Sequence, residues 1–582
     1  MTGPITQAMQ ELNALIAEAI QDAIAAGDLP AVEELPVFQI ERPADTAHGD
    51  FATNAALAVA RAFRRSPRQI AEAVVAHLAL ENTHFERAEI AGPGFINFFM
   101  AASWFADVVG GVIAQGKRYG RTDGGRGEKV MVEFVSANPT GPMHMGNARG
   151  GAIGDGLAAA LDWYGCDVTR EFYINDAGNQ IAKFGLSLEA RYLQHYRGEE
   201  AVPFPEDGYH GPDITAHAEA YIAAHGDDLL EKPSDERQAA LVDWALPQNI
   251  AKMQADMETY RIFFDVWFRE SSLHESGAVK AVVDELAARG LTYEKDGAIW
   301  YKNAEVAANR LRAEGKSEKQ IEALALKDDV LIRANGFPTY FAADIAYHKN
   351  KLVDRGFDRV IDVWGADHHG HVARLKGAMD ALGIGGDRLD IVLMQLVRLT
   401  RGGEPVRMSK RTGNAITLTD LLEEIPIDAA RFFFNLREPG SAFDFDLDLA
   451  VSETSDNPVY YVQYAHARIC SILKNLAAEG IRTDPATPEQ LLLLSDPAER
   501  DLIRALALLP EEIAAAAKSY DPARITRYAI EVATRFHRFY NTCRCKCGEP
   551  DLQSARVTLC LAARQTIENV LEMLRITAPE TM

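Results

Sequence analysis

Two short segments of the chain carry side chains that could act on a phosphate group. In the first, residues 132–149, a strand-like run leads through a loop with prolines and glycines to His144, Gly146 and Asn147, where a helix is expected to begin. Anions bind at helix amino termini, because unpaired N–H groups and the helix dipole favour negative charge there. The segment therefore predicts a nucleotide-phosphate site in which His144 and Asn147 add side-chain donors.

The second segment is a glycine-rich loop that contains Met408, Ser409, Lys410 and Arg411. A lysine and an arginine on such a loop can close over a polyphosphate and neutralise the charge that develops as a phosphate leaves. Each segment alone is a weak signal, because an ordinary surface loop explains either one. Their meaning depends on the elements that position them.

Strand-like and helical segments alternate around these residues. Apolar, β-rich runs occupy residues 130–137, 167–174, 330–333, 360–364 and 391–399, and a helix is expected over 147–164. Strands that alternate with helices are typical of a parallel sheet with crossover helices, which binds ligands at the carboxyl ends of its strands. The sequence thus predicts an α/β domain of the nucleotide-binding type. The first hundred residues predict a small α+β unit, and helical periodicity from residue 456 predicts a helical bundle.

Together, and in this order, the two segments resemble the His-Ile-Gly-His and Lys-Met-Ser-Lys-Ser signatures of class I aminoacyl-tRNA synthetases. Four further runs, at residues 133–139, 173–180, 364–371 and 456–468, are similar to bacterial arginyl-tRNA synthetases, so that the resemblance covers essentially the whole chain. It implies a ligase of translation that forms arginyl-adenylate from L-arginine and ATP and transfers arginine to the 3′ end of its tRNA. In this family, bound tRNA is typically needed before the first step proceeds.

The resemblance also implies a domain organisation. It assigns residues 1–120 to an added N-terminal α+β domain that binds tRNA, and residues 121–385 to a Rossmann-type parallel-sheet catalytic domain with an insertion near 198–237. Residues 386–455 would form the region of the signature loop and the tRNA stem contact. Residues 456–582 would form a C-terminal α-helical bundle that binds the anticodon.

The family pattern assigns roles to individual residues. A guanidinium is planar and always charged, so its pocket needs carboxylates and other acceptors in a fork. Glu133 and Asp344 would be these carboxylates, Tyr340 would contact the guanidinium, and Asn138 would hold the other end of the substrate. The full set of expected arginine contacts is Glu133, Asn138, Tyr340, Asp344 and Asp367. The expected ATP contacts are His144, Gly146, Gly365, His368, Met408 and Lys410, and the expected catalytic residues are His144, Asn147, Ser409, Lys410 and Arg411.

The signatures depart from the family pattern at one position. Asn147 stands in place of the second histidine, which keeps a hydrogen-bond donor but removes a possible charge. Some family members lack the signature lysine and carry a lysine three residues before the histidine instead. This chain has Gly141 there and keeps Lys410. We therefore expect the phosphate charge to be countered from the second segment.

Contacts with tRNA are expected at both ends of the chain. Phe95 and Asn97 stand where the family reads a D-loop base, although a core strand explains them equally well. Tyr461 and Arg468 are candidates for the anticodon side. Arg527 and Arg535 belong to a basic stripe on a predicted helix, for which a solvated charged face is the alternative interpretation.

Charge and composition limit the possible partners. With 60 basic and 84 acidic residues the net charge is −24, so the mean field repels polyanions and any contact with nucleic acid must be local. Apolar runs are interrupted by charge well before the ~18 residues that cross a bilayer. No secretory leader is evident, so we expect a cytoplasmic protein without a membrane segment. No extended apolar surface helix stands out, which favours a monomer.

Two clusters could be mistaken for metal sites. Cys543, Cys545 and Cys547 lack the spacing and the second ligand pair of a zinc knuckle, so incidental cysteines are the favoured interpretation. In the run from Asp367 to His371, adjacent side chains at a strand end point in divergent directions. We expect no structural zinc, and expect Mg²⁺ only as the companion of ATP.

Two other functions fit parts of the sequence. A class I synthetase for cysteine or methionine would lose the paired carboxylates and usually gain zinc ligands or an apolar cavity. A tRNA-binding or regulatory relative without catalysis would be expected to have decayed signatures, whereas His144 and Lys410 are both present. Arginine-dependent exchange of pyrophosphate into ATP distinguishes all three functions.

Overall fold

The chain forms two compact units in a computed structural model that describes residues 3–32, 35–313, 315–406 and 416–582. The central unit comprises Gly125–Ser452 and Tyr520–Ala523. The terminal unit comprises Met1–Gly124, Glu453–Ser519 and Arg524–Met582. None of the helices in the described ranges has the length and apolar composition that a bilayer crossing requires.

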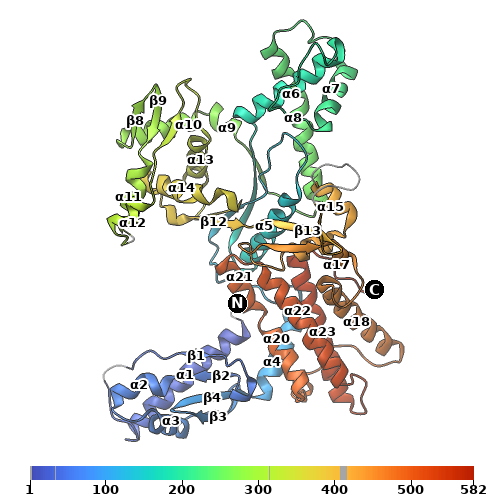
Figure 1. Ribbon diagram of the computed structural model, residues 1–582. Helices are drawn as coiled ribbons and strands as arrows, with labels where there is room; N and C mark the ends of the chain where they lie inside the picture. Colours follow the sequence, from blue (N-terminus) through green and yellow to red (C-terminus); the bar gives the residue numbers. More distant parts are fainter. Residues whose placement is uncertain (1–2, 33–34, 314, 407–415) are drawn as a thin grey trace. The chain divides into compact units, whose positions relative to one another are not determined.

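A five-stranded parallel sheet lies at the centre of the central unit (Figure 1). Its order is β12-β11-β5-β6-β7, with every neighbouring pair parallel. The strands are β5 (Lys129–Glu133), β6 (Asp167–Ile174), β7 (Val266–Arg269), β11 (Arg359–Gly365) and β12 (Leu389–Met394). Along the chain, β6 and β7 are added on one side of β5, and β11 is then added on its other side. This reversal of strand order marks the carboxyl ends of β5 and β11 as the place for a ligand.

Helix α5 (Met145–Tyr164) follows β5 and packs closely against it. A Cβ atom at Gly154 would lie 2.1 Å from the Phe134 ring, so only glycine permits this approach. Strand β5 ends at Glu133, earlier than the predicted 130–137, because Val135 and Ser136 adopt positive φ angles of 70° and 40° that a strand does not tolerate.

Three helices between β6 and β7 form an insertion with its own apolar core. They are α6 (Gly178–Arg197), α7 (Pro212–His225) and α8 (Ser234–Thr259), and Phe184, Tyr192, Ile214 and Leu241 are among the buried residues that they share. The insertion predicted near residues 198–237 lies within these three helices and their loops. The strand β7 that follows it was absent from the sequence-based prediction.

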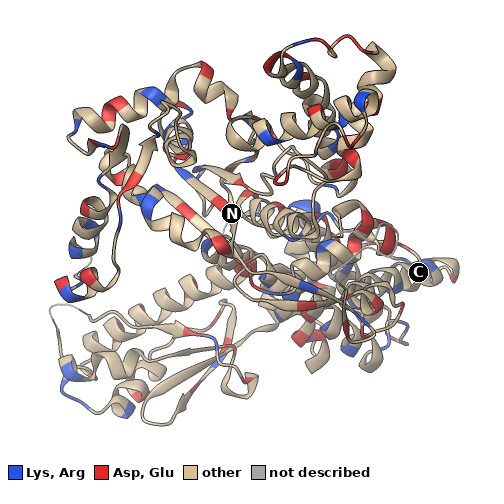
Figure 2. Ribbon diagram, turned by 45° about the horizontal axis from the view of Figure 1, so that its top comes forward, with Lys and Arg blue, Asp and Glu red and all other residues tan. Residues whose placement is uncertain are grey.

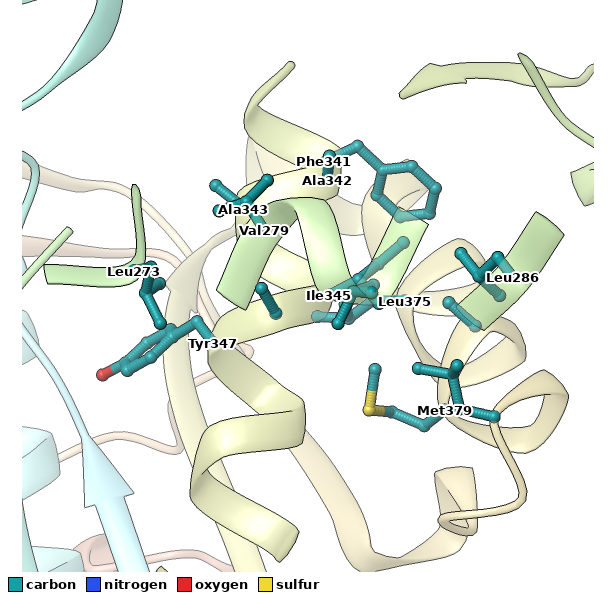
Figure 3. Close-up of a cluster of buried hydrophobic side chains, with 14 of the residues drawn as sticks. Leu273, Val279, Leu286, Phe341, Ala342, Ala343, Ile345, Tyr347, Leu375 and Met379 are labelled. Carbon is teal, nitrogen blue, oxygen red and sulfur yellow. The ribbon is translucent and has the colours of Figure 1, made fainter. Parts of the chain in front are cut away.

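A second insertion lies between β7 and β11. It contains the helices α9 (Ser271–Glu275), α10 (Ala278–Ala288), α11 (Asn303–Ala313), α12 (Glu318–Ala323) and α13 (Tyr340–Lys349), and the antiparallel strands β8 (Thr292–Lys295), β9 (Ala298–Tyr301) and β10 (Asp329–Ile332). The run at 330–333, expected in the parallel sheet, lies in this smaller sheet instead, because β10 pairs with β9. Figure 3 shows part of the apolar cluster that joins α10, α13 and α14 (His369–Ala381), including Val279, Ile345 and Leu375.

The predicted strand 391–399 is divided in two. Its first part belongs to β12, and its second part to β13 (Val397–Arg401), which forms a separate sheet with β14 (Glu404–Val406) and β15 (Phe443–Asp446). Helices α15 (Leu418–Glu424), α16 (Ile427–Phe434) and α17 (Leu447–Val451) complete the central unit.

The terminal unit contains an α+β part and a helical part. The α+β part has the antiparallel sheet β1-β2-β4-β3 and helices α1 (Pro4–Ala25), α2 (Ala55–Phe63) and α3 (Pro67–Ala76). Helix α4 (Ala102–Gln115) follows this sheet and packs against the helical part. Its strands are β1 (Ile40–Glu41), β2 (Phe51–Thr53), β3 (Phe85–Ala91) and β4 (Phe95–Met100). Residues 88–99 lie in the hairpin of β3 and β4, in which Gly92 and Gly94 turn the chain with positive φ angles.

The helical part confirms the predicted bundle. Its helices are α18 (Pro458–Ala478), α19 (Pro488–Leu491), α20 (Pro497–Ala507), α21 (Leu509–Ser519), α22 (Ala523–Thr542) and α23 (Pro550–Met573). The long helices α22 and α23 are amphipathic or largely buried, so the bundle has a continuous apolar interior that includes Phe536, Phe539 and Leu559. The fold class is therefore α/β with a Rossmann-type parallel sheet, an added N-terminal α+β part and a C-terminal helical bundle.

Candidate active site

The first signature segment makes backbone contacts with residues 416–418, which follow the second segment along the chain. His144 forms an isolated antiparallel bridge with Thr417. The Met145 N–H donates to the Ile416 carbonyl at 3.2 Å, and the Leu418 N–H donates to the Met143 carbonyl at 2.9 Å. The chain that follows the second segment thus lies beside His144. The expected residues Met408, Ser409, Lys410 and Arg411 fall outside the described residues.

The amino terminus of α5 has the features that favour an anion. His144 and Gly146 are exposed there. The Asn147 side-chain oxygen accepts a hydrogen bond from the His144 N–H at 2.9 Å, which fixes the first turn of the helix. The side-chain oxygen of Asn147 is thereby used to cap the helix, and the positive end of the helix dipole faces outward.

A cavity of about 830 Å³ opens at this helix terminus. His144, Met145 and Gly146 line one side, and Leu396, Leu399 and Phe443 in and beside β13 and β15 form an apolar wall. The charged pair Arg398 and Asp444 also lines the cavity. An apolar wall beside an anion-binding helix end suits a purine base with its phosphates.

Arg149 connects helix α5 to the loops beside this cavity. Its side chain is only 1% exposed, and its guanidinium donates to the carbonyl oxygens of Gln395, Glu438 at 3.2 Å and Ser441 at 2.8 Å. These carbonyls belong to the loops that precede β13 and β15. The buried arginine therefore holds α5 at a fixed position relative to the apolar wall.

Helix α13 carries two of the expected arginine contacts. Tyr340 is its first residue and Asp344 lies one turn later, so both project from the same side. The Thr339 hydroxyl caps this helix by accepting from the Ala342 N–H at 3.4 Å, and it donates to the Val330 carbonyl at 2.7 Å. The start of α13 is thereby fixed to β10.

Four of the expected site residues line one cavity of about 950 Å³. They are Tyr340, Asp344, Asp367 and His368. Gly365 ends the neighbouring strand β11. Asp344 accepts a hydrogen bond from His371, whose ring also contacts Arg374. His371 is thus engaged with a carboxylate and a guanidinium, which agrees with the preference against a zinc site in this run.

A buried carboxylate that the sequence analysis missed lies in an adjoining cavity of about 690 Å³. Glu270 is 3% exposed, follows β7 directly, and lines this cavity together with Tyr340 and His274. The His274 ring nitrogen lies 3.2 Å from its carboxylate. Burial raises the pKa of Glu270. The one signal that could have found Glu270 is its place directly after a strand, and that strand was not predicted.

Tyr173 joins the acidic side chains. Burial raises the pKa of its hydroxyl, and the charges of Glu270, Asp344 and Glu133 raise it further. Glu133 ends β5 and Glu270 follows β7, and these strands lie on either side of β6, which carries Tyr173. The carboxyl ends of these strands are therefore acidic, which suits a cationic ligand.

Glu133 differs from the other two carboxylates because a lysine already compensates its charge. The Lys351 ammonium lies 2.5 Å from Glu133 and 3.0 Å from Asp362, and all three side chains are buried. The Ser136 hydroxyl donates to the remaining Glu133 oxygen at 2.8 Å. Burial raises the pKa of Glu133, whereas Lys351 lowers it. Asn138, in contrast, is exposed in the loop that follows β5.

In the terminal unit the expected tRNA contacts have different environments. Asn97 is 7% exposed in the middle of the sheet, between Ala52 and Glu89, and Phe95 is half-buried. The Tyr461 ring lies 5.0 Å from that of His537, and Arg468 lies 4.5 Å from the centre of the Tyr540 ring.

The basic stripe on α22 is largely compensated by acidic side chains. Arg535 pairs with Glu531 at 2.6 Å and with Asp501 at 3.7 Å. Arg524 pairs with Glu512 at 2.9 Å. Arg527 is exposed.

Comparisons with known proteins identify the family. The model of the arginyl tRNA synthetase N-terminal domain matches residues 10–100, that of the class I (R) tRNA synthetase catalytic domain residues 108–440, and that of the DALR anticodon-binding domain residues 462–582. The arginine–tRNA ligases of Acetivibrio thermocellus and Caldanaerobacter subterraneus are each 52% identical over 100% of both chains. The solved Thermus thermophilus arginyl-tRNA synthetase is 21% identical and has a TM-score of 0.68 over 97% of this chain and 99% of that chain, which shows the shared fold. The chain belongs to the arginyl-tRNA synthetase family of class I aminoacyl-tRNA ligases.

Proposed function

We propose that this chain is an arginine–tRNA ligase whose guanidinium pocket is formed by Glu270, Asp344 and Tyr340. The observation that carries the assignment is the place of Tyr340, which lines both the cavity of Asp344 and the cavity of Glu270. Two carboxylates and a tyrosine hydroxyl offer several acceptors, which suit the fork of donors on a guanidinium. An apolar side chain would give these carboxylates no donor.

Glu133 has a supporting part in this proposal. Its charge is balanced by Lys351, so it adds less attraction for a cation than Glu270 or Asp344 does. It lies at the end of β5, five residues before Asn138. We assign Glu133 and Asn138 to the end of the substrate that carries the amine and carboxylate, with Asp367 nearby on the β11 side.

The first step is attack of the arginine carboxylate on the α-phosphorus of ATP, with pyrophosphate as the leaving group. The amino terminus of α5, with His144 and Gly146, binds phosphate oxygens, while Gly365 and His368 approach the nucleotide from the end of β11. Asn147 holds the helix turn through its cap. Ser409, Lys410 and Arg411, with Met408, would counter the charge that develops on the leaving phosphates.

Magnesium would enter with the substrate in this proposal. The described residues that line the helix-terminus cavity include one carboxylate, Asp444, which already pairs with Arg398 at 2.7 Å. This donor set fits a cation that is held by phosphates and water more than by the protein. When bound, Mg²⁺ would neutralise charge on the phosphates.

The second step transfers arginine to a ribose hydroxyl at the 3′ end of the tRNA. Tyr461 and Arg468 are the strongest candidates for base contacts in the helical bundle, since aromatic rings and guanidinium planes stack on unpaired bases. Arg527 and Arg535 are weaker candidates, and Phe95 and Asn97 remain candidates in the α+β part.

The proposal also includes the domain limits given in the sequence analysis, a monomeric state and a cytoplasmic location.

Exchange of labelled pyrophosphate into ATP tests the assignment. The full chain is assayed with arginine, cysteine or methionine, each with and without arginine tRNA. We expect exchange with arginine alone among the three amino acids, and stronger exchange when tRNA is present. Exchange with cysteine or methionine would contradict the pocket assignment. Loss of all exchange, with intact tRNA binding, would indicate a non-catalytic relative.

A further inference from the structure

Asp344 is the first member of a chain of polar contacts that leads away from the guanidinium pocket. Its Oδ2 atom lies 2.8 Å from Nε2 of His371. The other ring nitrogen of His371, Nδ1, lies 2.9 Å from a terminal nitrogen of Arg374. Arg374 also donates to Asp329 at 2.5 Å. The chain thus connects α13, α14 and β10.

The direction of each hydrogen bond follows from the chemistry of arginine. A guanidinium can donate hydrogen bonds but cannot accept them. Nδ1 of His371 must therefore be the acceptor of the Arg374 contact, and it carries no proton. The ring proton must lie on Nε2, from which it is donated to Asp344. Arg374 thereby selects one of the two neutral tautomers of His371.

The surroundings hold the imidazole ring in this orientation. Its side chain is 15% exposed. The ring lies 5.5 Å from that of Phe341, nearly at right angles, and 5.6 Å from that of Trp364. The Arg374 guanidinium lies 5.5 Å from the Phe341 ring, and Phe341 belongs to the buried cluster of Figure 3. Packing and hydrogen bonding therefore fix the same rotamer.

We infer that His371, held as its Nε2–H tautomer by Arg374, is a positioning residue that orients the Asp344 carboxylate for the guanidinium of the substrate. The hydrogen bond occupies one carboxylate oxygen and fixes the plane of the group, while the second oxygen is left to the ligand. Pairing with a planar guanidinium depends on that plane, so a rotated carboxylate would lose most of the interaction. The inference rests on the proposed function, in which Asp344 binds arginine.

Kinetics of the full chain in the pyrophosphate exchange assay, with tRNA present, test this role. His371→Leu removes the donor, and we expect the KM for arginine to rise about 10- to 100-fold, the effect of one hydrogen bond to a charged group. The KM for ATP is expected to change less than twofold. His371→Gln keeps an N–H donor and should recover most of the arginine affinity. His369→Leu is the matched control, because His369 is an exposed neighbour that does not line the cavity.

Two further variants separate this inference from the proposed function. If Asp344→Asn leaves the KM for arginine unchanged, the proposed pocket itself is wrong. If Asp344→Asn raises it and His371→Leu, while folded, does not, only the positioning role is wrong. Should His371→Leu fail to fold, Arg374→Met replaces it, since methionine has no hydrogen-bond donor for Nδ1. An arginine KM within twofold of wild type in Arg374→Met would overturn the inference.

The tautomer can also be observed directly. In the full chain labelled with ¹⁵N-histidine, the resonances that disappear in His371→Gln belong to His371. We expect one nitrogen with a proton and one without, and we expect this pattern to change in Arg374→Met, which has no donor for Nδ1. A ring that is protonated on both nitrogens in the wild-type chain would contradict the inference.

Discussion

Glu133 and Glu270 have the same side chain and similar burial, but their carboxylates contact different partners. The Lys351 ammonium contacts Glu133 at 2.5 Å and is shared with Asp362, so Glu133 already has a fixed cation within the protein. Glu270 meets a tyrosine hydroxyl and the His274 ring, and burial raises its pKa. A buried carboxylate without a fixed cation can be stabilised by a cationic ligand, so Glu270 and Glu133 should respond differently to the loss of charge.

Glu270→Gln should weaken substrate binding without weakening the fold. We expect the KM for arginine to rise about 100-fold, because the guanidinium loses a buried charged partner. The free energy of unfolding should stay within about 1 kcal/mol of wild type, since glutamine keeps an oxygen that can accept a hydrogen bond from the His274 ring. Pyrophosphate exchange and urea unfolding of the full chain measure the two quantities.

Glu133→Gln provides the complementary result. It removes one of the two carboxylates beside Lys351, and we expect the free energy of unfolding to fall by about 3 kcal/mol. The KM for arginine should rise less than in Glu270→Gln. The assignment of the guanidinium pocket would be wrong if Glu133→Gln had the larger effect on arginine and Glu270→Gln had none.

Helix α13 presents Tyr340 and Asp344, and buried charges anchor its carboxyl end. Lys351 lies in a turn of π-helix, Asn350–Asp354, that continues α13 and brings the ammonium between Glu133 of β5 and Asp362 of β11. The buried Tyr347 hydroxyl donates to Glu171 of β6 at 2.5 Å. The same helix therefore carries the proposed substrate contacts at its start and contacts three strands of the sheet at its end.

Lys351→Met should release this anchor. Two buried carboxylates would lose their shared cation, and we expect the free energy of unfolding to fall by about 3 to 5 kcal/mol. Tyr347→Phe, which removes only a hydroxyl, should cost about 1 to 2 kcal/mol. Urea unfolding of the full chain, followed by circular dichroism, compares the variants. A Lys351→Met variant as stable as wild type would show that the ion pair does not hold α13.

In the terminal unit, His84 connects two helices at the start of β3. Its ring nitrogens lie 2.6 Å from Glu11 of α1 and 3.0 Å from Asp107 of α4, so both must carry protons to donate to these carboxylates. Burial alone would lower the pKa of His84, but the hydrogen bonds to Asp107 and Glu11 outweigh it and raise the pKa above 6.5. The protonated ring is therefore the form that the fold stabilises.

The stability of the terminal unit should consequently fall as the pH rises. Because the folded pKa lies above the unfolded value, the contribution of His84 is fully present below pH 6.5 and is lost as the pH passes through the folded pKa. Urea unfolding between pH 5.5 and about pH 8.5 should show this loss in the wild type and a flatter profile in His84→Gln. Identical profiles in the two proteins would contradict the prediction.

The sequence predicted those elements whose signals are local. The helix α5 and the strand β6 follow from glycine spacing and β-rich runs, and the helices of the terminal bundle follow from their periodicity. The separation of β10 from the parallel sheet did not follow, because strand pairing depends on distant partners. Glu270 was missed since β7 has only four residues and no motif surrounds it. The spacing of Glu531 and Arg535 makes their pair a local one, but the contact of Arg535 with Asp501 of another helix follows from no local pattern.

The net charge of −24 sets a condition for binding tRNA anywhere on the molecule. Figure 2 shows acidic and basic residues mixed along the helices and loops of both units. An arginine whose charge is already neutralised gains little from a phosphate, because it must first leave its carboxylates. Only cations without an acidic partner, or aromatic rings that stack on bases, should contribute strongly to tRNA affinity.

Arg468 and Arg535 provide a matched test of this condition. Arg468 lies beside the Tyr464 and Tyr540 rings and has no ion pair within the described part of the chain, whereas Arg535 pairs with Glu531 and Asp501. We expect Arg468→Gln to weaken tRNA binding about 10-fold and Arg535→Gln less than about threefold. Filter binding of arginine tRNA at several salt concentrations gives both affinities, and the arginine KM at saturating tRNA serves as the control for the central unit. A larger effect of Arg535→Gln would mean that the ion pairs of α22 open when tRNA binds, and would restore the basic stripe as the main contact.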